Sequence, residues 1–145
     1  MYTAIKHLHS YWAYLVVLIV FLATINALVK YFGKKPYESK DFRISLFALI
    51  VTHIQLLIGI VIYFVSPYFQ AFSNQGMGEV MKDSTLRLYL IEHPLTMIVA
   101  TVLITMGYSK HKKVLSSRPK FKKVALFYTL ALLLILSRIP WQAWF

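Results

Sequence analysis

The sequence predicts an all-α integral membrane protein, a four-helix bundle formed by a single domain of 145 residues. Hydrophobic residues make up 59% of the chain and charged residues 14%, and the mean hydropathy is +0.62. Soluble domains average about 45–50% apolar and about 25% charged residues. The apolar residues also gather in four runs of the length that crosses a bilayer, about 20 residues. This composition excludes a soluble enzyme, a disordered tail and a nucleic-acid-binding domain.

The four predicted spans are Tyr11–Val29, Ile44–Val65, Leu88–Tyr108 and Val124–Phe145. Each must be helical, because the hydrocarbon interior offers no water to the backbone amides and carbonyls. The longest connection, Ser66–Arg87, begins with Ser-Pro and is broken by Gly76 and Gly78. Its amphipathic part, Glu79 to Leu86, is predicted to form a short helix on the membrane surface.

Lysine and arginine are distributed unevenly between the connections. The first and third connections hold 12 of the 16 basic residues: Lys30, Lys34, Lys35, Lys40, Arg43, Lys110, Lys112, Lys113, Arg118, Lys120, Lys122 and Lys123. By the positive-inside rule, these connections are expected in the cytoplasm and both termini on the outer, periplasmic side. Attraction of the third connection to anionic lipids is a weaker interpretation of the same charges. The formal net charge of +11 is therefore attributed to membrane orientation rather than to nucleic-acid binding.

Ionisable side chains inside a bilayer are costly and therefore mark candidate functional positions. The predicted spans contain His53, Glu92, His93 and Arg138, and His9 lies at the outer edge of the first span. At about 1.5 Å of rise per residue, Glu92, His93 and Arg138 share a level about 7–10 Å below the outer surface. His53 lies near the bilayer centre by the same estimate. The two remaining histidines, His7 and His111, are expected to be ordinary solvated residues.

Two histidines on different helices, in an apolar interior without a cluster of acidic ligands, favour haem b, whose iron takes imidazoles on both sides. We expect His53 and His93 to be the axial ligands. His9 is the substitute ligand, because the levels of His53 and His93 differ by about 9 Å. Arg87 and Arg138 are expected to balance the haem propionates. The chain contains no cysteine, which excludes iron–sulfur clusters and covalently attached c-type haem.

Each candidate also has a purely structural interpretation. Glu92 and Arg138 would form an ion pair that neutralises two otherwise costly charges. His53 would be a neutral histidine hydrogen-bonded to a neighbouring helix, since an unpaired imidazole facing lipid is unfavourable. A zinc or copper site is less favoured, because three histidines at three depths do not converge. A proton relay is also less favoured, because no chain of acidic residues crosses the membrane.

Four short segments together resemble a group of small four-span bacterial membrane proteins described as cytochrome b-like. The segments are His9-Ser10, Thr52-His53-Ile54-Gln55-Leu56-Leu57-Ile58-Gly59, Glu92-His93 and Arg138-Ile139-Pro140-Trp141. The resemblance extends over essentially the whole chain. It implies a b-type haem or another redox role in the bacterial inner membrane, with His9, His53 and His93 at the matching positions. The predicted cytoplasmic half has no histidine for a second site, which weighs against two haems.

These expectations define two functional hypotheses. The first is a haem-b protein that transfers electrons, with a quinone among its expected partners. The second is a non-catalytic accessory subunit, whose membrane-protein partner or second copy would pack on a stripe of small or polar residues: Ser45, Ala48, Thr52, Gln55, Gly59 and Tyr63. Both are favoured over a stand-alone enzyme. A transporter is disfavoured, because four spans are few and no inverted repeat is evident.

Overall fold

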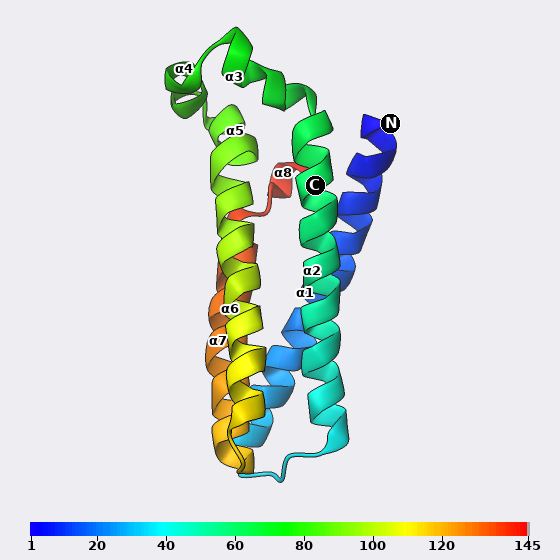
Figure 1. Ribbon diagram of the computed structural model, residues 1–145, viewed down its shortest axis with the longest axis vertical. Coiled ribbons are helices and arrows are strands. Elements are labelled where there is room, and N and C mark those ends of the chain that lie inside the picture. The colour runs from blue at the N-terminus through cyan, green and yellow to red at the C-terminus, as the bar shows by residue number, and fades with distance from the viewer. Residues whose placement is uncertain (145) are drawn as a thin grey trace.

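The computed structural model describes residues 1–144, and Phe145, the last residue of the predicted fourth span, lies outside the described part. No strand is present within residues 1–144, and four long helices pack side by side (Figure 1). These helices are α1 (Tyr2–Phe32), α2 (Ser39–Val65), α6 (His93–Lys113) and α7 (Ser117–Arg138). The predicted all-α fold is confirmed.

The connection between α2 and α6 folds into several short helical segments instead of one surface helix. They are η1 (Pro67–Gln70), α3 (Ala71–Asn74), α4 (Met77–Lys82), α5 (Ser84–Arg87) and η2 (Leu88–Glu92), the last being one turn of π-helix. Ala71, Val80, Leu86 and Leu90 form a small core of their own. The connection therefore folds onto the entrance of α6 at one end of the bundle, as Figure 1 shows.

In the described part of the chain, three helices are long and apolar enough to cross a membrane: Tyr2–Phe32, Ser39–Val65 and the continuous stretch Ser84–Lys113 formed by α5, η2 and α6. These helices identify the chain as a membrane protein. α7 does not meet the same criterion, because Lys122 and Lys123 near its start and Arg138 at its end confine the uncharged run to residues 124–137. It ends earlier than the predicted span because Pro140 cannot continue a helix, and the short α8 (Trp141–Trp144) follows.

The long helices contact one another in the ring order α1, α2, α6 and α7. α1 and α6 are therefore diagonal to each other, and each packs on both α2 and α7. The seam between α2 and α6 is the most loosely packed of the four. In contrast, α6 and α7 approach closely at Gly107, where an added Cβ would lie 2.6 Å from the Cβ of Phe127. The side of α6 that carries Gly107 therefore accommodates a neighbouring helix at this level.

The two ends of the bundle differ in charge and in packing. At one end, here called the basic end, α1 and α6 finish and α2 and α7 begin, which brings together the basic residues of the first and third connections. The most deeply buried large side chains of the bundle lie toward this end, among them Ile104, Phe121 and Tyr128. The Tyr128 hydroxyl donates a hydrogen bond to the Ser45 carbonyl, 2.8 Å away. The opposite end contains the N-terminus, the α2–α6 connection and α8 (Figure 1).

Candidate cofactor site

His9 of α1 and His93 of α6 face each other across the interior near the opposite end of the bundle. Their ring centroids are 6.1 Å apart and the rings are inclined by 77°. Because α1 and α6 are diagonal, this contact crosses the space enclosed by α2 and α7. Both side chains are half-buried. The fold thus brings together two imidazoles that are 84 positions apart in the sequence.

The end of α7 orients the His93 ring. Helix α7 stops at Arg138, and Ile139 before Pro140 is extended, as the residue preceding a proline prefers. The carbonyl of Arg138 is one of the last four in the helix, which lack intrahelical donors. His93 Nδ1 donates to this carbonyl over 2.8 Å. A carbonyl oxygen only accepts, so Nδ1 carries a proton; a metal-ligating histidine is commonly held by such a hydrogen bond from its other ring nitrogen.

The backbone around His93 departs from regular α-helix. The π turn of η2 precedes it and Pro94 follows it. Pro94 has no N–H to donate to the carbonyl of Leu90, and the Tyr63 hydroxyl of α2 donates to that carbonyl over 3.0 Å. Single π turns inside helices occur frequently at functional sites. This hydrogen bond joins α2 to η2 three residues before His93.

Helix α2 holds His9 in place. Gln55 Nε2 donates to the His9 carbonyl over 2.8 Å, and one turn along α1 the indole of Trp12 donates to the Val51 carbonyl over 2.9 Å. Gly59 lies directly beside the imidazole, since a Cβ there would be 3.4 Å from His9 Cε1. The predicted small-residue stripe of α2 therefore faces this site and the bundle interior.

Two polar atoms at the site lack partners. His9 Nδ1 and Gln55 Oε1 are buried, and neither has a hydrogen-bond partner among the described residues. A buried polar atom left without a partner costs about 1–3 kcal/mol. Unsatisfied groups of this kind in a native protein are explained by strain, by a catalytic or redox role, or by a bound water or ion.

The separation of the two rings suits ligation of a single metal ion. A metal–imidazole bond of about 2.0–2.1 Å, plus about 1 Å from nitrogen to ring centre, places two imidazoles on opposite sides of one metal with centres about 6 Å apart. The observed separation is 6.1 Å. Together with the unpartnered His9 nitrogen, this distance matches the ring spacing that two imidazoles on one haem iron would have.

The structure places His53 away from His93. Its Nδ1 donates to the Leu49 carbonyl over 2.8 Å, and its Nε2 lies 3.3 Å from Thr105 Oγ1 of α6. From residue 93 to residue 105, α6 rises about 18 Å. The pair expected from the sequence, His53 and His93, is therefore not brought together, whereas the substitute, His9, faces His93.

Glu92 lies between the two arginines expected to hold propionates. Its carboxylate is 2.9 Å from Arg87 Nε and 3.9 Å from Arg138 Nε. Arg87 also donates to the Met81 carbonyl over 2.8 Å, so it is the more firmly held of the two. The closer ion pair of Glu92 is thus with Arg87, while Arg138 keeps a longer contact on the same carboxylate.

The prediction that His111 is solvated is wrong. Its exposed fraction is 0%. Its Nδ1 donates to the Tyr108 carbonyl, and its Nε2 accepts from the Tyr37 hydroxyl over 2.9 Å. His111 lies in the last turn of α6, and the first connection folds over it through Tyr37. The place of His111 in the sequence, near a predicted membrane surface, did not indicate that the first connection would bury it.

Sequence reasoning did not identify Gln55 or Pro140 as site residues. Gln55 was expected only to take part in helix packing. The signal for Pro140 was its place two positions after Arg138, which predicts a helix end and a carbonyl without a helical donor. Nothing in the sequence shows that this carbonyl meets His93.

Within residues 1–144, no group of three or more histidine, cysteine, aspartate or glutamate side chains is arranged to hold a metal ion. No family model, curated protein or solved structure matches this chain. The geometry of the His9–His93 pair therefore carries the functional argument.

Proposed function

We propose that this protein is a membrane-embedded haem-b protein that transfers electrons, with His9 and His93 as the axial ligands. The single observation that carries the proposal is the pair of imidazoles 6.1 Å apart across the bundle interior. Haem would supply a one-electron ferric–ferrous couple at this position. The resemblance to cytochrome b-like proteins implies a b-type haem as well, with His9, His53 and His93 at the matching positions.

The chain's own residues would tune such a site. The hydrogen bond from His93 Nδ1 to the Arg138 carbonyl fixes the ring and raises the basicity of Nε2. Gly59 leaves room beside His9, and the hydrogen bond from Gln55 anchors the backbone that carries it. Arg138, held loosely by Glu92, would balance the charge of a propionate.

The membrane arrangement belongs to the same proposal. α7 would be the fourth crossing, since it packs on both α1 and α6. The basic end would face the cytoplasm of a bacterial cell, with both termini on the periplasmic side of the inner membrane. Fusing alkaline phosphatase to the C-terminus tests this orientation: high phosphatase activity is expected, and an inactive fusion would refute it.

The accessory-subunit hypothesis receives less support. It rested on the small-residue stripe of α2 as a surface for another protein. Ser45, Ala48 and Thr52 are at most 5% exposed, and Gln55 and Gly59 contact His9 within this chain. The stripe is therefore already covered by the chain's own helices.

Absorption spectra of the purified full-length protein, oxidised and then reduced with dithionite, test the haem proposal. A Soret band with sharp α and β bands on reduction is expected. His9→Ala and His93→Ala should each abolish these bands or convert them to a five-coordinate spectrum. His7→Ala is the matched control, since His7 is exposed on the same helix and stacks only on Tyr11.

His53→Ala separates the two possible ligand pairs. The proposal expects this variant to retain the wild-type spectrum. Loss of haem on substitution of His53, with haem retained by His9→Ala, would refute the assignment. Because a variant can fail to fold, each one is also checked by circular dichroism. Restoration of the six-coordinate spectrum by added imidazole in His9→Gly would show that only the ligand was missing.

Pro140→Ala tests how His93 is oriented. Without proline, α7 can extend, and the Arg138 carbonyl can accept from the backbone N–H of residue 142 instead of from His93. Loss of such a supporting hydrogen bond lowers metal affinity by about 10–100-fold. Haem should dissociate faster from this variant, and the rate is measured by the transfer of haem to apomyoglobin. An unchanged rate would show that the carbonyl does not support His93.

A further inference from the structure

A cleft of about 440 Å³ opens at the basic end of the bundle. Its lining residues are Lys30, Lys34, Lys35, Pro36, Ser117 and Arg118, and none of them is acidic. They come from the last turn of α1, the first connection and the first turn of α7. The volume lies within the range of about 300–1,000 Å³ that is typical of small-ligand sites.

The walls of this cleft are tied together by specific contacts. The backbone N–H of Tyr37 donates to Ser117 Oγ over 2.8 Å, which joins the first connection to the start of α7. The guanidinium of Arg118 lies over the ring of Tyr31, 4.6 Å from its centroid. These contacts hold segments that are about 80 positions apart in the chain around one opening.

The cations of the cleft are only partly balanced by acidic residues. Lys30 Nζ is 2.8 Å from the buried carboxylate of Asp41 and is thereby neutralised. Lys34, Lys35 and Arg118 have no ion pair among the described residues. Three uncompensated positive charges thus border a single cleft.

We propose that this cleft binds a phosphate group, as the headgroup of an anionic phospholipid supplies it at the adjoining membrane surface. Arginine and lysine are the usual phosphate ligands, arginine through two parallel N–H···O bonds. The cleft also lies at the N-terminus of α7, a helix of 22 residues, where the dipole favours an anion. Basic pockets between helices at the cytoplasmic side are known sites of anionic lipid headgroups. This inference is independent of haem binding.

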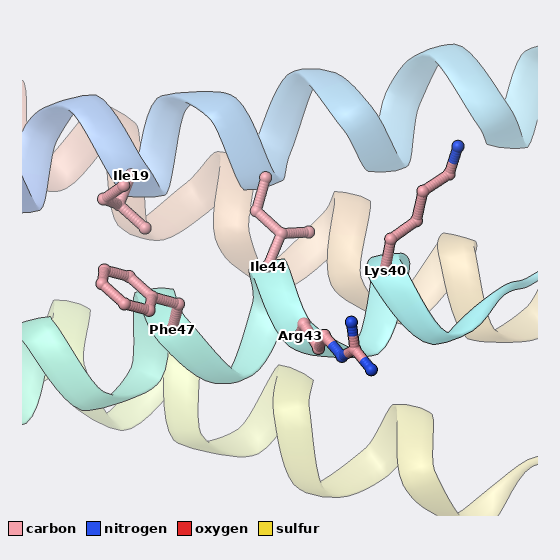
Figure 2. A pocket seen from close by; sticks show the side chains of 5 residues that line it. All are labelled: Ile19, Lys40, Arg43, Ile44 and Phe47. Atoms are coloured by element: carbon pink, nitrogen blue, oxygen red, sulfur yellow. The ribbon is translucent and has the colours of Figure 1, made fainter.

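A second cleft, of about 350 Å³ between α1 and α2, has different chemistry (Figure 2). Ile19 and Phe47 face each other across it with Ile44 beside them, and only Lys40 and Arg43 supply charge. Lys40 is already 3.3 Å from Glu38. The apolar walls of this second cleft suit any acyl chain and do not distinguish between headgroups. Phosphate selectivity is therefore assigned to the cleft beside α7.

Native mass spectrometry of the full-length protein in detergent tests the proposal, with phosphatidylglycerol and phosphatidylcholine added in parallel. The cleft variant is Lys34→Gln/Lys35→Gln/Arg118→Gln. Its matched control, Lys110→Gln/Lys113→Gln/Lys122→Gln, removes three exposed cations from the same end but not from the cleft. The two variants have equal net charge, so a difference between them reports the site rather than the overall field.

Preferential binding of phosphatidylglycerol by the wild-type protein is expected. Each lost cation should weaken it about fivefold, so the cleft variant should bind about 100-fold more weakly, and the control within about fivefold of wild type. Equal weakening of both variants, or no preference over phosphatidylcholine, would overturn the proposal. Adding inorganic phosphate distinguishes the source: displacement of the lipid by millimolar phosphate assigns the site to free phosphate, and persistence assigns it to the lipid headgroup.

Discussion

Gly107→Ala tests the close packing of α6 against α7 directly. The new Cβ would lie 2.6 Å from Phe127 Cβ, 3.3 Å from Phe127 Cγ and 3.4 Å from Tyr128 Cδ1. Carbon atoms prefer about 3.5–4.0 Å, so the shortest contact is too close by about 1 Å. Because both atoms in that contact are Cβ atoms, no change of rotamer relieves it. The two helices must move apart instead.

The expected cost follows from two opposing effects. Overpacking of a well-packed interface costs about 1–3 kcal/mol. Alanine favours helix over glycine by about 0.8–1.0 kcal/mol, which offsets part of this cost. We therefore expect Gly107→Ala to lower the free energy of unfolding by up to about 2 kcal/mol, a factor of up to about 30 in the folded-to-unfolded ratio.

The assay is unfolding of the protein in mixed micelles by increasing sodium dodecyl sulfate, followed by circular dichroism and tryptophan fluorescence. Gly78→Ala is the control, since nothing lies within 4 Å of its new Cβ and its stability should be unchanged or slightly raised. Gly59→Ala should also change stability little, because its Cβ would lie in ordinary contact with the His9 ring, 3.4 Å from Cε1. If Gly107→Ala is as stable as Gly78→Ala, the close approach of α6 and α7 is refuted.

Two further predictions concern the basic end. Burial, followed by the Asp41 carboxylate, raises the pKa of Tyr37 from 10.0 to about 12. Because the folded state favours the neutral phenol, Tyr37 stabilises the folded protein below pH 10, and this stabilisation is lost as the pH rises through 12. Tyr37→Phe should remove this loss, seen as a smaller fall in unfolding free energy between pH 10 and 12. At neutral pH, the Tyr37→Phe substitution should lower the free energy of unfolding by about 1–3 kcal/mol, because the buried His111 Nε2 loses its hydrogen-bond donor. Asp41→Asn should destabilise by about 3 kcal/mol, since Asp41 is 3% exposed and Lys30 keeps only its longer ion pair with Glu38, 3.9 Å away. Substituting the exposed Glu79 by glutamine should change stability by less than about 1 kcal/mol; equal effects at the two carboxylates would contradict this ranking.

Some features of the fold could be read from local sequence because their causes are local. Apolar runs of sufficient length must form helices in a bilayer, and the structure is helical over the first three predicted runs and over residues 124–138 of the fourth. The outer connection was less predictable. Its division into several short segments depends on Val80, Leu86 and Leu90 packing on one another, a contact between residues that hydropathy alone cannot pair.

The candidate site was predictable as a set of residues but not as an arrangement. The cost of ionisable groups in an apolar run singled out His9, His53 and His93. His53 was expected as the partner of His93 although their estimated depths differ by about 9 Å, and His9 was the substitute for that reason. Depth, however, specifies only one of the coordinates that bring two side chains together; the other two are the rotation of each helix and its place in the ring of four.

By itself, the sequence determined that the chain is a helical membrane protein, that its basic residues gather at one end, and that only a few ionisable residues are candidates for chemistry. Only the tertiary structure decided that α1 and α6 are diagonal, so that His9 meets His93 while His53 bonds to Thr105. It also decided that the carbonyl freed by Pro140 orients His93. The physical reason is that hydropathy and charge act on each residue through its immediate solvent, whereas the pairing of side chains depends on helix rotation and neighbour order, which the packing of the whole bundle sets.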